Sequence, residues 1–186
     1  RVVQMGNDRK VMPGSELTYQ SYGVPWANVS NTPFREYKHW VHEGGIATPF
    51  IAHWPQGIRD FGSLRHEPAQ LPDIMATCLD IAKVNYPETF RGQEIQPHEG
   101  YSLASVFTGA GFEREVLTWE HEGNKAVRKG RWKLVTKYPG GWELYDIERD
   151  RTELKDLSSK HPEVVKELSD LYQHWADRCG VKPWDE

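Results

Sequence analysis

The sequence has few cysteines, no long apolar run and no excess of basic residues. Two cysteines in 186 residues exclude a disulfide-rich scaffold. No apolar run approaches the roughly 18 residues of a membrane span. The 23 Lys and Arg against 27 Asp and Glu give a net charge of −4, so we expect no binding of nucleic acid. Hydrophobic residues make up 38%, which is enough for a packed core and places the chain among globular proteins.

The first thirty residues show no hydrophobic period. They are rich in Gly, Pro, Asn, Ser and Tyr, which predicts a loop over residues 1–30. The sequence begins at Arg1 without an initiator Met and without the charged and apolar regions of a signal peptide. We therefore expect this sequence to belong to a longer protein. We also expect limited proteolysis to cut first before Ser30.

One apolar run and one helical pattern occupy the middle of the sequence. Residues 46–54, IATPFIAHW, are followed by a Pro-Gln-Gly turn and predict a buried strand. Residues 72–84 predict a helix that begins at Pro72. The spacing of its apolar residues predicts one core-facing side that includes Cys78. The members of that side are Ile74, Met75, Cys78, Leu79 and Ala82.

The pattern changes after Gly111 to short strands separated by turn residues. Lys129-Gly130 and residues 139–141 (Pro-Gly-Gly) predict two tight turns. The sequence therefore predicts an antiparallel meander whose four strands are residues 115–120, 126–128, 132–137 and 143–147.

An amphipathic helix is predicted after the meander, over residues 162–178, with Gly180 as its stop. We expect its apolar stripe to pack on the meander, which makes a small α+β unit from about residue 111 onward. The stripe consists of Val164, Leu168, Leu171 and Trp175, and it is widened by Val165 and Tyr172.

Polar and aromatic side chains are densest in residues 26–45. Lys38 precedes the pair Gly44-Gly45, and glycines permit a close approach of the backbone to a ligand. Lys38 is therefore a candidate anion clamp. The alternative is a solvated loop whose charges pair with each other. Other candidates in this segment are Asn28, Asn31, Arg35, His39, His42 and Glu43.

Histidines offer two further candidates. His39 and His42 are three residues apart, which suits one helical face and a shared metal ion, but no HExxH motif or cysteine pair supports such a site. His121 lies between two glutamates, so it is a candidate proton donor or substrate contact. The alternative for this second run is an edge strand protected by charge.

Several motifs together resemble one known family. Lys38, Glu43-Gly44-Gly45 and Pro49 follow the spacing K-x-x-x-x-E-G-G-x-x-x-P, and residues 73–82, 100–103 and 126–146 supply later landmarks in the same order. From residue 21 on, the sequence is similar to the C-terminal half of a bacterial arylsulfatase of the type I sulfatase family.

The resemblance implies an α/β fold. Residues 1–110 would be the C-terminal portion of an alkaline-phosphatase-like catalytic sandwich. Residues 111–186 would form a small α+β domain with a four-stranded antiparallel sheet and a C-terminal helix. Relatives are commonly periplasmic or secreted, which is the localisation that the resemblance suggests.

The resemblance also implies hydrolysis of sulfate esters by a formylglycine made in a C/S-x-P-x-R motif, with a Ca²⁺ ion that polarises the sulfate. Lys38 matches the family lysine and would contact a sulfate oxygen. His121 would border the pocket, and Asn28, Asn31 and Arg35 would contact or support the substrate. The substrate would be a small sulfate ester or a sulfated glycan.

No C/S-x-P-x-R motif occurs in the 186 residues. We therefore expect the formylglycine and all Ca²⁺ ligands to lie outside this chain, in the remainder of the catalytic domain, and the chain alone to be inactive. The exposed apolar run at 46–54 would then favour oligomerisation or poor solubility. Two alternatives are a phosphate or phosphonate ester hydrolase of the same superfamily and a non-catalytic α+β module that binds a glycan or a protein partner.

Overall fold

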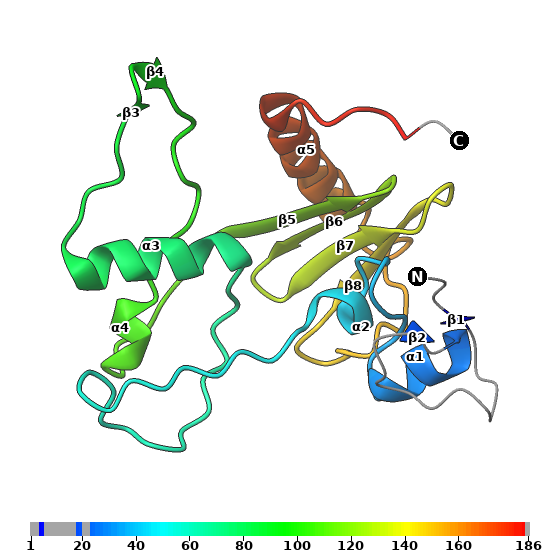
Figure 1. Cartoon of the computed structure of the whole chain (residues 1–186). Helices are drawn as coiled ribbons and strands as arrows, with labels where there is room; N and C mark the ends of the chain where they lie inside the picture. The colour runs from blue at the N-terminus through cyan, green and yellow to red at the C-terminus, as the bar shows by residue number, and fades with distance from the viewer. Residues whose placement is uncertain (1–3, 6–17, 20–22, 185–186) are drawn as a thin grey trace. The chain divides into compact units, whose positions relative to one another are not determined.

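A computed structural model describes residues 4–5, 18–19 and 23–184 (Figure 1). Two short strands, β1 (Gln4–Met5) and β2 (Thr18–Tyr19), pair in parallel. Helix α1 spans Val24–Ser30, with a proline in its first turn. The predicted loop over residues 1–30 is therefore wrong for this segment, because proline suits the start of a helix as well as a turn. The loop prediction is also wrong for β1 and β2, and most of the remaining residues that it covers lie outside the described part of the chain.

Contacts divide the chain into two compact units. One unit combines the described residues up to Thr48 with residues 118–184. The other comprises residues 49–117. The boundary predicted at residues 110 and 111 refers to the domains of the parent protein and stays a prediction.

The first unit is built on a four-stranded sheet in the order β5-β6-β7-β8 (Figure 1). Strands β6 and β7, and β7 and β8, are antiparallel, and their register places Val127 opposite Leu134 and Leu134 opposite Leu144. These three side chains are fully buried. The predicted meander is confirmed, with strand bounds of Val116–His121 for β5, Asn124–Lys129 for β6, Trp132–Thr136 for β7 and Trp142–Asp146 for β8.

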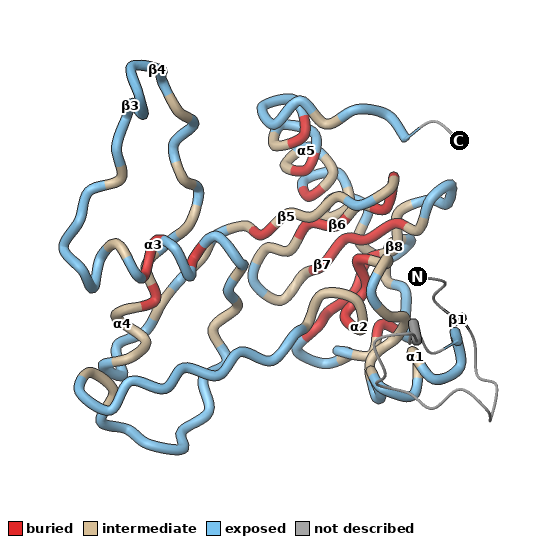
Figure 2. Tube along the Cα trace, viewed as in Figure 1, coloured by how far each residue is buried: buried red, intermediate tan, exposed pale blue. Residues whose placement is uncertain are grey.

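Helix α5 (Pro162–Cys179) packs against β6 and β7, as predicted. Its buried residues are Leu168, Tyr172 and Ala176, which lie one helical turn apart and appear as the red positions along α5 in Figure 2. Gly180 ends the helix in the left-handed conformation, with a φ of 68°. Glycine adopts this conformation without steric cost, which explains the stop.

A second cluster of buried residues forms on the sheet around Ala126 and Val135, which are register partners. It contains Val41, and Ile46 packs against it. Ile46 is the last residue of the short helix α2 (Glu43–Ile46). The segment that carries the Glu-Gly-Gly motif is thus packed on the sheet.

The second unit contains helix α3 (Leu71–Ala82), the β3–β4 hairpin (Thr89–Phe90 and Gln93–Glu94) and helix α4 (Ala104–Phe107). The predicted helix is confirmed, but its predicted core face is wrong, because Ile74, Met75 and Cys78 are exposed. The buried side of α3 is Asp73, Ala76 and Thr77.

Backbone capping explains why α3 buries polar residues. The carboxylate of Asp73 accepts hydrogen bonds from the backbone N–H groups of Gln70 (2.7 Å) and Tyr101 (2.9 Å), and it forms an ion pair with Arg114. The hydroxyl of Thr77 accepts a bond from the N–H of Leu103 (2.8 Å). These side chains satisfy donors that would otherwise be buried without partners.

The predicted strand at residues 46–54 is also wrong. Ile46 ends α2, and residues 47–54 are irregular and mostly exposed. A strand needs a neighbour for its N–H and C=O groups, and no strand in the described part of the chain pairs with this run.

Within the part of the chain that the structure describes, no helix is both long and apolar enough to cross a membrane.

Candidate functional site

The Glu-Gly-Gly motif is attached to the sheet by a buried cluster of charges. The carboxylate of Glu43 accepts a hydrogen bond from the ammonium of Lys133 in β7 (2.9 Å), and that ammonium also pairs with Glu153 (2.8 Å). The second oxygen of Glu153 accepts a bond from the backbone N–H of Glu43 (2.7 Å). All three side chains are buried, so the cluster fixes the start of α2 to the sheet.

The electrostatics of this cluster favour the charged form of Glu43. Burial by itself raises the pKa of a carboxyl group, but Lys133 and Arg151 outweigh burial and hold the pKa of Glu43 below its ordinary value. Arg151 contributes through a bond from its Nε to Glu43 Oε2 (3.2 Å). Removing one partner from such a buried pair typically costs about 3–5 kcal/mol.

The two glycines of the motif allow a close approach of backbone segments. A Cβ atom on Gly44 would lie 2.2 Å from the carbonyl oxygen of Glu36, and one on Gly45 would lie 1.9 Å from that of Trp40. Both distances are too short for any side chain. The motif therefore folds the preceding loop, which contains Lys38 and His39, tightly against α2.

Arg35 fixes the other end of this loop. Its Nη1 donates to Glu143 Oε2 (3.3 Å), to the hydroxyl of Tyr145 (3.0 Å) and to the carbonyl oxygen of Glu153 (3.0 Å). The tyrosine hydroxyl itself donates to Glu143 (2.8 Å). Burial and the hydrogen bond to Glu143 raise the pKa of Tyr145, which keeps it a neutral donor. Arg35 thus joins the loop to β8.

Lys38 lies on the exposed side of this loop. Its ammonium makes no hydrogen bond or ion pair with any residue that the structure describes. The amides of Asn28 and Asn31 donate back within α1, to the carbonyl oxygens of Val24 (3.0 Å) and Ala27 (2.7 Å). Contact of any of these residues with a substrate stays a prediction.

The metal pair suggested by the spacing of His39 and His42 does not form. His42 precedes α2 as its N-cap residue and is fully buried, with its Nε2 3.5 Å from Glu143 Oε2. His39 lies in the loop before it, with a φ of 114°, and its side chain is partly exposed. The three-residue spacing implies a shared face only in a helix, and these residues are not helical.

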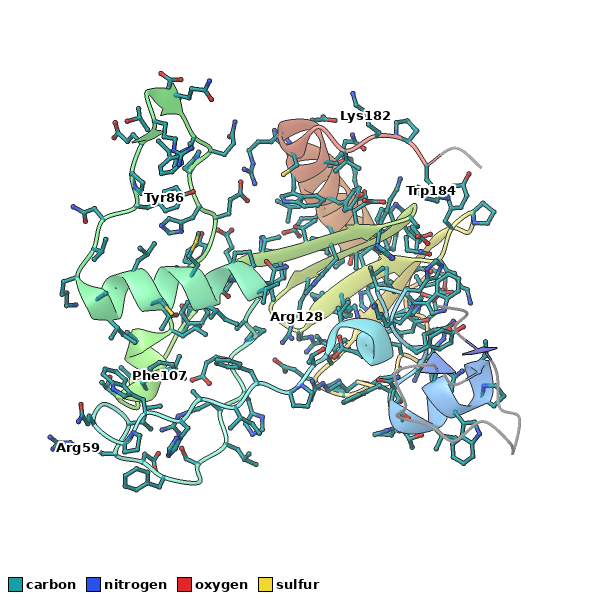
Figure 3. The ribbon with its side chains drawn as sticks, viewed as in Figure 1. Arg59, Tyr86, Phe107, Arg128, Lys182 and Trp184 are labelled. Atoms are coloured by element: carbon teal, nitrogen blue, oxygen red, sulfur yellow. The ribbon has the colours of Figure 1, made fainter. Side chains whose placement is uncertain are left out.

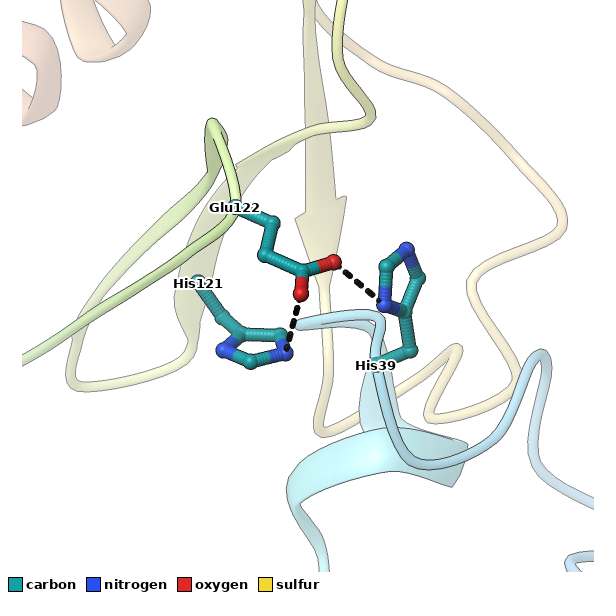
Figure 4. A group of neighbouring side chains, drawn as sticks. All are labelled: His39, His121 and Glu122. Atoms are coloured by element: carbon teal, nitrogen blue, oxygen red, sulfur yellow. Dashed lines mark ion pairs between the residues drawn. The ribbon is translucent and has the colours of Figure 1, made fainter. Parts of the chain in front are cut away.

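His39 instead lies beside the turn between β5 and β6. Its Nδ1 is 2.8 Å from Glu122 Oε2, and its ring contacts that of His121 edge to face with centroids 5.5 Å apart (Figure 4). His121, a sequence candidate, is thus brought next to the loop of Lys38. The sequence does not predict that Glu122 lies beside His39, because the two residues are 83 positions apart and no motif connects them.

Comparison with known proteins identifies the family. The family described as N-sulphoglucosamine sulphohydrolase, C-terminal, matches residues 35–177. The chain belongs to this sulfatase family. The match extends from Arg35, at the base of the Lys38 loop, almost to the end of α5, so it includes the sheet and the charge cluster around Glu43. The resemblance to the C-terminal part of a sulfatase is confirmed.

Curated sulfatases align with much of this member of the sulfatase family. The chain is 31% identical to an uncharacterized sulfatase of Schizosaccharomyces pombe, over 90% of the chain and 32% of that protein. It is 28% identical to the N-acetylgalactosamine-6-O-sulfatase of Bacteroides thetaiotaomicron, over 75% of the chain and 29% of that protein. The chain therefore spans about a third of the length of these relatives.

Solved structures share the fold. The crystal structure of Ps i-CgsB has a TM-score of 0.62 at 20% identity, over 78% of this chain and 32% of its own. A structure from work on glycosaminoglycan metabolism by Bacteroides thetaiotaomicron has a TM-score of 0.61 at 24% identity. The match covers 76% of this chain and 31% of the other. This likeness confirms the predicted α/β fold class, with its four-stranded antiparallel sheet and C-terminal helix.

Proposed function

We propose that this chain is the C-terminal part of an enzyme that hydrolyses sulfate esters. Membership of the sulfatase family supports the reaction class. The observation that carries the proposal is the position of Lys38, five residues before Glu43, in a loop that the buried pair of Glu43 and Lys133 attaches to the sheet. The substrate class that we propose is a small sulfate ester or a sulfated glycan.

Lys38 is the proposed cationic contact to a sulfate oxygen. Lys38 is exposed and its ammonium has no partner among the described residues, so an anion that binds it breaks no ion pair with any of these residues. Charge-assisted hydrogen bonds of this kind contribute about 1.5–3 kcal/mol, and more where charge develops in a water-excluded site. The exposed ring of His121 would border the same pocket and donate to a polar group of the substrate.

Arg35, Asn28 and Asn31 have a supporting role in this proposal. Arg35 already donates to three acceptors on the sheet side of the loop, and both asparagines bond within α1. We propose that Arg35 positions the Lys38 loop and that Asn28 and Asn31 contact or support the substrate from the end of α1.

The proposed enzyme uses Ca²⁺ and formylglycine, as the family resemblance implies. Calcium takes about six to eight oxygen ligands. Among the described residues, the one group of three metal-ligating side chains is His39, His121 and Glu122, which offers two nitrogens and a carboxylate. This group does not fit Ca²⁺. We propose that the Ca²⁺ ligands and the nucleophile lie outside this sequence, that the chain alone is inactive, and that the parent protein is exported.

The test is sulfate release from an aryl sulfate by the full-length parent protein with Ca²⁺, compared between the wild type and Lys38→Ala. We expect turnover to fall about tenfold to a hundredfold, the equivalent of one charge-assisted contact. The matched control is Lys182→Ala, an exposed lysine beyond the end of α5 (Figure 3). We expect the 186-residue chain alone to release no sulfate.

Each outcome has a definite meaning. Equal turnover of wild type and Lys38→Ala, with melting temperatures unchanged, would make Lys38 a loop charge and remove the central support of the proposal. Faster cleavage of an aryl phosphate than of the aryl sulfate by the wild-type protein would replace the sulfatase assignment with a phosphatase of the same superfamily.

A further inference from the structure

Two segments far apart in the sequence present three potential metal ligands at one place. His39 comes from the loop before α2, and His121 and Glu122 come from the end of β5 and the turn after it (Figure 4). One ligand atom of each side chain lies within 4.8 Å of the others. The carboxylate of Glu122 lies between the rings, 2.8 Å from His39 Nδ1 and 3.9 Å from His121 Nε2.

We propose that His39, His121 and Glu122 bind a divalent transition-metal ion of the Zn²⁺ type. Imidazole nitrogen and carboxylate oxygen are ligands that zinc accepts at about 2.0–2.2 Å, which places tetrahedral donors about 3.3 Å apart. The two observed separations, 2.8 and 3.9 Å, lie on either side of that value. Three protein ligands leave a fourth position for water or another oxygen ligand.

A buried asparagine bridges the backbones of the two histidines. The Nδ2 of Asn124 donates to two backbone carbonyl oxygens, that of His121 at 2.8 Å and that of His39 at 3.5 Å. Its Oδ1 accepts a bond from the N–H of Tyr138 (3.0 Å). Asn124 therefore connects both ligand-bearing segments without any contribution from a metal. A site whose ligands are held in place loses less conformational entropy when an ion binds.

The turn geometry directs Glu122 toward the histidines. Glu122 and Gly123 have φ values of 51° and 79°, the pattern of a tight hairpin turn with two left-handed residues. The N–H of Gly123 donates to the carboxylate of Glu120 (2.9 Å). A Cβ on Gly123 would lie 2.8 Å from the ring of Tyr138, so the turn packs closely against that residue. These constraints fix the direction in which the Glu122 side chain leaves the turn.

The surroundings suit an ion that enters from solvent. The side chains of His39, His121 and Glu122 are 42%, 54% and 37% exposed. The ring of His39 contacts that of Trp40, and the ammonium of Lys137 lies 4.0 Å from the Trp40 ring centroid and pairs with Glu36 (2.8 Å). The positive charge of Lys137 is thus balanced by the carboxylate of Glu36 before a metal binds. Nitrogen-rich ligand sets favour Zn²⁺, Ni²⁺ or Cu²⁺ over Ca²⁺ and Mg²⁺, so this site is separate from the proposed calcium site.

The test is a titration of the full chain, purified without a polyhistidine tag, with Co²⁺ as a spectroscopic substitute for Zn²⁺. We expect one equivalent to bind with visible absorption bands and to be displaced by Zn²⁺. His121→Gln and Glu122→Gln should each weaken binding by about tenfold or more, since loss of even an outer partner of a metal ligand costs that much. Melting temperature in excess Zn²⁺ gives a second readout, since binding to the native state raises it.

The control variant is His174→Gln, an exposed histidine on α5, which should bind Co²⁺ as the wild type does. His121 lies at an exposed strand end, so its replacement is compatible with folding, whereas His39 occupies a left-handed conformation that a substitution can disturb. Absence of saturable binding, or equal affinity in the wild type and His121→Gln, would make the group an ordinary surface ion pair and overturn the proposal.

Discussion

At the scale of residues, the main finding is that one sequence motif combines two physical roles. Glu43 supplies a buried carboxylate for Lys133. Gly44 has no Cβ atom, which allows the carbonyl oxygen of Glu36 to lie close to its backbone. The partners of Glu43 lie 90 and 110 residues along the chain. Such a motif fixes a loop in place, and the loop then presents Lys38 to solvent.

The buried imidazole of His42 predicts a pH dependence of stability. Burial lowers the pKa of His42, with Arg35 and Lys133 adding to the effect and Glu153 opposing it. Between the lowered native pKa and the ordinary value of about 6.5, the unfolded state binds a proton that the native state does not, so the free energy of unfolding rises with pH in this window. His42→Gln removes this proton linkage, and we expect a flatter curve below pH 7 in urea unfolding measured from pH 5 to 8.

The exposed His66 provides the matched control for this prediction. His66→Gln should leave the slope of stability against pH unchanged. If His42→Gln and the wild type have parallel curves from pH 5 to 8, then the pKa of His42 is not lowered in the native protein, and His42 contributes nothing to acid destabilisation.

At the scale of elements, local patterns predict the meander, whose strands follow one another along the chain, and the helix after it. Glycine placement predicts the turn at Gly130, short strands separated by turn residues predict the meander, and helical periodicity of apolar residues predicts α5. All three are confirmed. The strands of the meander pair with strands that follow one another along the chain, whereas α5 packs mainly against β6 and β7, although β8 is the strand that precedes it. Local signals therefore predict the elements of this small α+β unit, and the packing of α5 follows from its apolar stripe.

The same signals fail where the partner is distant. The run at residues 46–54 is apolar enough for a strand, but no described strand pairs with it. Helix α3 has an apolar side, yet its buried side is the one on which Asp73 caps backbone donors. In the candidate site, Lys38 and His121 could be proposed from the sequence, whereas the contact of Glu122 with His39 depends on long-range folding.

The packing of α5 on the sheet gives the element-scale prediction. Leu168 is almost fully buried between α5 and the sheet. Leu168→Ala leaves a cavity in this interface, and we expect a loss of about 2–5 kcal/mol in the free energy of unfolding. Urea denaturation with circular dichroism measures it. The exposed Leu154 gives the control, because Leu154→Ala removes the same atoms without a cavity. A loss below 1 kcal/mol for Leu168→Ala would show that α5 contributes little to the stability of the sheet.

At the scale of the molecule, the second unit exposes large apolar side chains along the segment between Pro49 and α3. Ile51 is 88% exposed, Phe61 74% and Leu64 81%. Where such side chains form one contiguous patch, the patch marks an interaction site or a liability to aggregate. The chain spans about a third of the length of its curated relatives, and we propose that in the parent protein the remainder of the catalytic domain packs against this segment.

The isolated 186-residue chain is therefore expected to self-associate. Sedimentation velocity should show a mass that increases with concentration, because each copy can bury apolar side chains of the second unit against another copy. The double variant Ile51→Ser, Phe61→Ser should shift the distribution toward the monomer. Val29→Ser, which changes an exposed apolar residue of α1 in the first unit, should not. A wild-type chain that sediments as a monomer at all concentrations would show that this segment does not need a partner.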